Sequence, residues 1–123
     1  MKKVPGLAFV LFFLISCGKP LPDLSSVNIE TWKNDRGGCK NERATYADAL
    51  TQKIEELKGL SEDQVIKLLG RPDRNELYKR NQKFYYYDIE PGKSCSAEQP
   101  ANLQLVFRFN AMSRAKEVSI EKR

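Results

Sequence analysis

The sequence predicts an α+β fold in which two helices pack on one face of an antiparallel sheet of three or four strands. Two observations indicate this fold. Apolar residues recur at helical spacing between residues 42 and 69, and they alternate at strand spacing between residues 74 and 121. Because the strands follow one another with turns between them, we expect the element order ααββββ and a two-layer sandwich.

The first predicted helix covers residues 42–58. Its apolar stripe is formed by residues three or four positions apart, which are Tyr46, Leu50, Ile54 and Leu57. Either Asn41 or Thr45 can cap the first turn, and Gly59 can end the last one.

The second predicted helix is short and has a signal at each end. Ser61 at the N-cap and Gln64 three residues later form a capping box. Gly70 can adopt the left-handed conformation that ends a helix, and Pro72 cannot continue one. The pattern therefore predicts a helix between Ser61 and Gly70.

Four strands are predicted, over residues 74–79, 83–89, 103–109 and 116–121. In the second of them, Tyr85 and Tyr87 are in phase with Ile89, so we expect these tyrosines to face the core. Phe84 and Tyr86 then lie on the outer face of the sheet.

The N-terminus resembles the export signal of bacterial lipoproteins. A pair of lysines precedes an apolar run over residues 4–15, which is shorter than the roughly 20 residues that a membrane-spanning helix needs. The run ends in Leu14-Ile15-Ser16-Cys17, which is similar to a lipobox. The resemblance implies that residues 1–16 are removed as a signal peptide and that Cys17 carries the lipid. An uncleaved N-terminal membrane helix is the alternative.

Lipidation would keep the protein on a membrane surface, because two or more acyl chains hold a protein stably. Residues 17–30 contain two prolines and little periodicity, so we expect a lipidated tether there and a single domain over residues 31–123. By analogy with lipoproteins, Gly18 in place of an aspartate favours the outer membrane. The predicted location is the cell envelope, facing the periplasm.

Two further cysteines, Cys39 and Cys95, predict one disulfide, because disulfides persist in exported domains. Cys95 lies in a long loop over residues 90–102, which a bridge would pin. A zinc site is the alternative, but two isolated cysteines in a chain without histidine are a poor ligand set. We predict neither a metal nor another cofactor.

The charge pattern and the missing histidine argue against two classes of function. The net charge is +5 with no long run of like charges, which does not indicate nucleic-acid binding. Without histidine, neither a Ser-His-Asp nor a Cys-His arrangement can be built. Structural roles are expected for Glu55-Glu56, for Glu62-Asp63, and for Asp35 and Arg43, which we expect to pair with each other. No enzyme is predicted.

The region over residues 59–73 resembles a known family. Gly59-Leu60-Ser61-Glu62-Asp63-Gln64-Val65 and Leu68-Leu69-Gly70-Arg71-Pro72-Asp73 are similar to a segment of outer-membrane assembly lipoproteins of the BamE (SmpA/OmlA) type. The resemblance implies two helices on a three-stranded antiparallel sheet. The same signature recurs in β-lactamase-inhibitor-like domains, and Trp32-Lys33-Asn34-Asp35 looks like part of a family of small lipoproteins of unknown function. The long loop, the disulfide and the fourth strand depart from the BamE pattern.

A partner surface is expected on Phe84 and Tyr86, on the outer face of the sheet, and on Trp32. For Trp32 the alternative, which the sequence favours, is that it covers the edge of the core. The sequence and the resemblance together predict a non-enzymatic, membrane-anchored lipoprotein that binds a protein or envelope component in envelope assembly or maintenance. An inhibitor or small-ligand-binding module on the same scaffold is the alternative.

Overall fold

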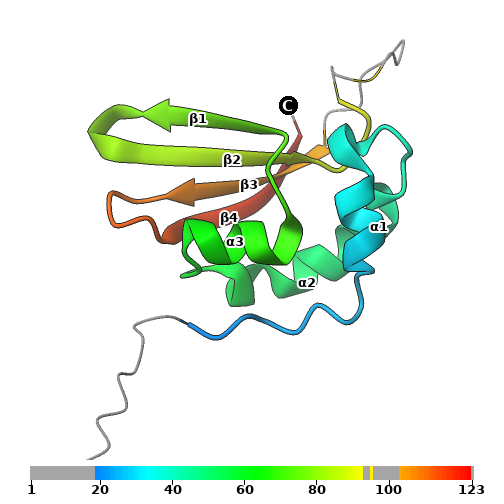
Figure 1. Ribbon diagram of the computed structural model, residues 1–123, viewed down its shortest axis with the longest axis horizontal. Coiled ribbons are helices and arrows are strands. Elements are labelled where there is room, and N and C mark those ends of the chain that lie inside the picture. The colour runs from blue at the N-terminus through cyan, green and yellow to red at the C-terminus, as the bar shows by residue number, and fades with distance from the viewer. Residues whose placement is uncertain (1–18, 93–94, 96–102, 123) are drawn as a thin grey trace, which may run out of the picture.

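The computed structural model has helices packed against one face of an antiparallel sheet (Figure 1), which confirms the predicted α+β class. The structure describes residues 19–92, 95 and 103–122. The sheet of this part has the strand order β1-β2-β3-β4, and one helix precedes the two that the sequence predicts. The elements are α1 (Ile29–Asn34), η1 (Arg36–Gly38), η2 (Arg43–Tyr46), α2 (Ala47–Leu57), α3 (Glu62–Leu69), β1 (Arg74–Tyr78), η3 (Lys79–Asn81), β2 (Gln82–Asp88), β3 (Leu103–Phe109) and β4 (Ala115–Lys122).

Helix α1 and the stretch before it correct the predicted tether. Leu24 and Val27 are buried in the core, so packing of the domain begins before residue 31. The Asn28 side chain caps α1 by accepting a hydrogen bond from the Thr31 amide at 3.1 Å. A helix of six residues is too short to persist by itself, and burial of the Trp32 indole supplies the stabilisation that the local sequence lacks.

The predicted helix over residues 42–58 forms in two parts, the 3-10 turn η2 and the α-helix α2. Leu50 and Leu57 of the predicted stripe are buried, and its other two members are half-buried. The predicted caps, Asn41 and Thr45, are wrong, because α2 continues from η2 without a side-chain cap.

Helix α3 confirms the predicted capping box. The Ser61 amide donates to Gln64 Oε1 at 2.9 Å, and the Gln64 amide donates to Ser61 Oγ at 3.2 Å. At the other end, Gly70 has a φ of 83°, a conformation that costs a residue with a Cβ atom 1–2 kcal/mol in rough terms. Local chemistry therefore sets both ends of α3.

Alternation along the strands gives the sheet one buried face and one outer face, and every predicted strand end lies within one residue of the observed end. Tyr85 and Tyr87 are buried, as predicted. Tyr85 stands opposite Phe107 of β3, which extends the buried face across the sheet. Phe84 and Tyr86 are half-buried on the outer face.

The predicted disulfide between Cys39 and Cys95 is present, with a Cα–Cα distance of 5.4 Å and a sequence separation of 56. It joins the segment after η1 to the segment that follows β2. Gly38 makes this approach possible, because a Cβ atom there would lie 2.8 Å from the Glu90 carbonyl oxygen. The bridge therefore fixes one end of the sheet against the segment after α1.

We expect Cys39→Ser and Cys95→Ser each to lower the free energy of unfolding by about 2–4 kcal/mol, because either change frees a long loop in the unfolded chain. The double variant should cost little more than either single one, since both remove the same bond. Urea unfolding under oxidising conditions measures the three losses. Equal midpoints for wild type with and without reductant would contradict this prediction.

Candidate functional site

A buried polar cluster lies where α1, η2 and the ends of β1 and β2 meet. Its centre is Arg43, whose side chain is 1% exposed and whose guanidinium lies 4.6 Å from the Trp32 ring centroid. Arg43 Nη1 donates to Asp73 Oδ2 at 2.7 Å and to the Asp88 carbonyl at 3.1 Å. Arg43 Nε donates to the Trp32 carbonyl at 2.9 Å. This buried guanidinium is therefore both paired and hydrogen-bonded.

The two aspartates beside Arg43 organise the surrounding backbone. Asp73 accepts hydrogen bonds from the amides of Gly37, at 2.8 Å, and Asp88, at 2.7 Å. Asp35 accepts from the Lys40 amide at 2.7 Å and from the Arg43 amide at 2.9 Å. The Asp73 bonds connect segments that are far apart in the sequence, whereas the Asp35 bonds close a local turn.

The predicted pairing of the Asp35 and Arg43 side chains is wrong, although the two residues do share a hydrogen bond. Asp35 binds the backbone amide of Arg43, whereas the Arg43 guanidinium pairs with Asp73. The Asp35 carboxylate already accepts hydrogen bonds from backbone amides of the turn that leads into η2. The Arg43 side chain extends away from that turn toward the sheet.

The Asp88 carboxyl lies beside this cluster, and its pKa is shifted. Burial raises the pKa of its carboxyl above the ordinary value, the negative charge of Asp73 adds to the shift, and Arg74 opposes it. Arg74 Nη2 lies 3.6 Å from Asp88 Oδ1. Such a carboxyl can be a proton-transfer group. Within the described residues its side chain forms an ion pair with Arg74, which is a structural interaction.

Trp32 is a correction to the predicted partner surface. Its side chain is 0% exposed and contacts the Tyr87 ring at a centroid distance of 6.2 Å. An indole in this position cannot touch a partner of the folded domain, because α1 turns it toward the core. The prediction of Trp32 as a binding residue is therefore wrong.

A row of aromatic side chains does lie on the outer face of the sheet, and we call Tyr78, Phe84 and Tyr86 the aromatic row. The Tyr78 and Phe84 ring centroids are 5.9 Å apart, and those of Phe84 and Tyr86 are 6.1 Å apart. The Arg74 guanidinium covers Tyr86 at 4.7 Å from the centroid, and the Tyr86 hydroxyl donates to Glu76 at 3.2 Å. Tyr78 is 59% exposed.

Sequence reasoning missed Tyr78 as a member of the row, although a usable signal was present. Tyr78 is in phase with Arg74 and Glu76 in a predicted strand, and the hairpin brings it beside Phe84. Phe84 and Tyr86 are brought together as predicted for one face of β2.

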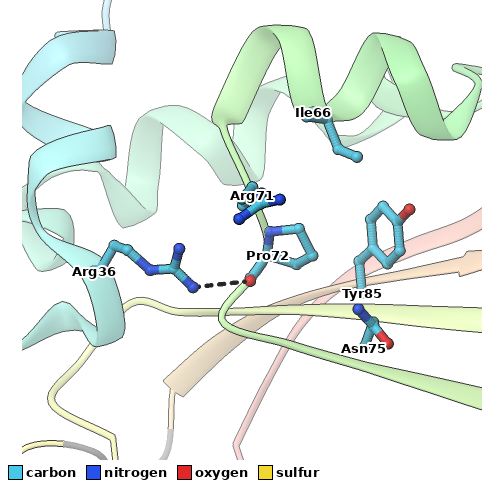
Figure 2. A pocket seen from close by; sticks show the side chains of 6 residues that line it. All are labelled: Arg36, Ile66, Arg71, Pro72, Asn75 and Tyr85. Atoms are coloured by element: carbon cyan, nitrogen blue, oxygen red, sulfur yellow. Dashed lines mark hydrogen bonds between the residues drawn. The ribbon is translucent and has the colours of Figure 1, made fainter.

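A small pocket of about 280 Å³ opens beside the start of β1 (Figure 2). It is lined by Arg36, Ile66, Arg71, Pro72, Asn75 and Tyr85. Figure 2 shows Arg36 on one side, donating to the Pro72 carbonyl, and Tyr85 with Asn75 on the other. The sequence did not predict this pocket.

The wall of the pocket is held by a hydrogen bond between a strand and a helix. The Tyr85 hydroxyl donates to Glu62 Oε1 at 2.8 Å, and Lys83 Nζ donates to the same oxygen at 3.1 Å. Burial would raise the pKa of Glu62, but the hydrogen bonds from Ser113, Tyr85 and Lys83 together lower it. Glu62 is therefore a charged acceptor that anchors the first turn of α3 to β2, which agrees with the structural role expected of it.

The predicted signal peptide, residues 1–16, and the predicted lipidation site, Cys17, fall outside the described residues. Within residues 19–92, 95 and 103–122, no three His, Cys, Asp or Glu side chains gather as a metal site. The helices of this same part are too short or too polar to cross a membrane.

Comparison of the chain with protein-family models, curated proteins and solved structures finds no match. The class that the geometry defines is thus a small α+β domain with one disulfide, an aromatic row on its outer face and a small basic pocket near its sheet edge. The resemblance to BamE-type lipoproteins stays a hypothesis.

Proposed function

We propose that this chain is a non-enzymatic lipoprotein of the bacterial cell envelope that is anchored through Cys17 and binds a protein partner. The Leu14-Ile15-Ser16-Cys17 run supports the anchor, because its cysteine follows a short apolar segment where a lipobox requires it. The disulfide supports an exported location, since such bonds persist in oxidising compartments. By the BamE resemblance, the proposal extends to envelope assembly or maintenance at the outer membrane.

The observation that carries the partner proposal is the aromatic row next to an open sheet edge. Strand β1 is an edge strand, paired only with β2 among the described strands, and four of its five residues are exposed. Backbone groups on such an edge can pair with an added strand. Tyr78 and Phe84 lie beside that edge and offer rigid apolar area with little conformational entropy to lose.

The occupant that fits both features is an extended segment of a protein partner. Its backbone would pair with β1, and its apolar side chains would cover Tyr78 and Phe84. Two hairpin residues close by, Lys79 and Arg80, are exposed and favour a partner segment that also carries acidic residues. Specificity would come from the side chains and affinity from the edge.

We expect Tyr78→Ala to weaken partner binding by a factor of about 30, equivalent to the roughly 2 kcal/mol typical of an interface anchor. The measurement is photocrosslinking in intact cells from a photoreactive phenylalanine analogue at position 84, with and without Tyr78→Ala. Met112→Ala is the matched control, because Met112 is also an exposed apolar residue but lies outside the row.

A second analogue at Gln52, which is exposed on α2, reports contacts on the helical side. Adducts formed equally from positions 52 and 84, or lost equally in Met112→Ala, would remove the aromatic row as the binding surface. The anchor is tested in the same cells by Cys17→Ser. A variant that stayed membrane-bound and carried labelled lipid would overturn the lipoprotein assignment.

A further inference from the structure

The pocket beside β1 has a feature that the fold does not use. The Arg71 guanidinium is exposed and has no hydrogen-bond or ion-pair partner among residues 19–92, 95 and 103–122. Arg36 is partly engaged: it donates to the Pro72 carbonyl at 3.3 Å, and its Nε lies 3.9 Å from Asp73 Oδ1. The Asp73 charge is already paired with Arg43 at 2.7 Å. The pocket therefore has two guanidinium groups with unused donors.

Three of the other residues that line the pocket offer apolar atoms, namely Ile66 of α3, Pro72 and Tyr85 (Figure 2). Asn75 adds one amide group. The Tyr85 hydroxyl does not contribute a free donor, because it is bonded to Glu62. At about 280 Å³ the pocket is near the lower end of small-molecule sites.

We propose that this pocket binds a small carboxylate that carries an apolar side group. A guanidinium fork matches the planar geometry of a carboxylate, and Ile66, Pro72 and Tyr85 offer apolar atoms to an adjoining apolar group. A dianionic phosphate fits less well, because Asp73 lies next to Arg36 and repels the second charge. The site uses residues from η1, α3, β1, β2 and the link between α3 and β1. Its two sheet residues, Asn75 and Tyr85, lie on the face opposite the aromatic row, so the site stands apart from that row.

Arg71 could instead stabilise the fold, and the experiment has to distinguish that role from ligand binding. Basic residues near the end of a helix interact favourably with its dipole, and Arg71 follows α3 by two residues. Lys67, in the last turn of the same helix, has the same charge but does not line the pocket. Lys67→Gln is therefore the control that shares the dipole effect and the loss of one charge.

The test uses the full chain, labelled with ¹⁵N and kept in neutral detergent. N-acetyl-L-leucine is titrated against it, with N-acetyl-L-leucinamide and inorganic phosphate as comparison ligands. We expect the carboxylate to shift the Asn75 side-chain amide and the Arg71 Nε resonance with a millimolar dissociation constant. The amide should bind at least tenfold more weakly, and so should phosphate.

Arg71→Gln should weaken N-acetyl-L-leucine binding at least tenfold without changing the melting temperature by more than a few degrees. Lys67→Gln should leave binding unchanged. Arg36→Gln should also weaken binding, and if that variant does not fold, Arg71→Gln decides alone. Equal binding of the amide, tighter binding of phosphate, or equal weakening by Lys67→Gln would each overturn the site. None of these results bears on the aromatic row, so the two proposals fail separately.

Discussion

Asp73→Asn should lower the free energy of unfolding by about 3–5 kcal/mol, because it leaves the Arg43 guanidinium buried without its counter-charge. The Arg43 side chain is 1% exposed and that of Asp73 is 7% exposed, so water cannot replace the lost partner. The Gly37 and Asp88 amides donate to different oxygens of the carboxylate, so the single oxygen of an asparagine can accept from only one of them, and its NH2 group faces the other donor. Urea unfolding followed by circular dichroism measures the loss.

The matched control is Glu55→Gln, which breaks a pair on the surface. Glu55 Oε1 lies 2.9 Å from Lys58 Nζ, but its side chain is 82% exposed, so we expect a loss of at most about 1 kcal/mol. Combining Asp73→Asn with Arg43→Met should recover part of the stability, because no buried charge then remains. A loss in Asp73→Asn no larger than in Glu55→Gln would contradict the buried pair.

Trp32→Ala should destabilise the domain by about 3–5 kcal/mol, the range for removing a buried aromatic side chain. The change opens a cavity against Tyr87 and also removes the ring on which Arg43 stacks. Because the chain has a single tryptophan, unfolding has to be followed by circular dichroism and not by its fluorescence.

Two further variants sharpen this test of Trp32. Trp32→Phe should cost less than Trp32→Ala, since it fills much of the space and removes an indole N–H that has no partner among the described residues. Tyr78→Ala, at an exposed ring, should change stability by less than about 1 kcal/mol. If Trp32→Ala lowered the free energy of unfolding no more than Tyr78→Ala does, the burial of Trp32 in the core would be contradicted.

The elements that could be predicted are those whose causes lie within a few residues. Ser61 and Gln64 are three positions apart and make both bonds of their capping box to each other, so the start of α3 is visible in the sequence. The strands are visible for the same reason, because the phase of Tyr85, Tyr87 and Ile89 shows which face is buried.

Helix α1 and the Arg43 cluster could not be predicted, because their causes are distant in the sequence. Arg43 and Asp73 are 30 residues apart, and an arginine is rarely expected in a core without a known partner. Helix α1 forms over a segment with no apolar period, and it exists because Trp32 packs against Tyr87 of β2. The residues around Trp32 in the sequence do not determine whether its side chain is buried.

The candidate site divides in the same way. The alternation along one strand predicted that two members of the aromatic row, Phe84 and Tyr86, lie on the outer face of the sheet. The pocket draws Arg36, Arg71 and Asn75 from three separate segments. Arg71 and Asn75 are only four residues apart, but nothing in the local pattern brings Arg36 to them, since that contact depends on how η1 docks against the start of β1.

If Cys17 carries the proposed lipid, the contact between Lys19 and α2 limits how far the domain can move from it. Lys19 Nζ donates to the carbonyl oxygens of Glu56 and Lys58, each at 2.8 Å, so the chain is already docked two residues after that cysteine. Two residues of extended chain span only about 7 Å. A domain lipidated at Cys17 would then stay close to the bilayer surface, and a protein that binds it would have to do so near the membrane.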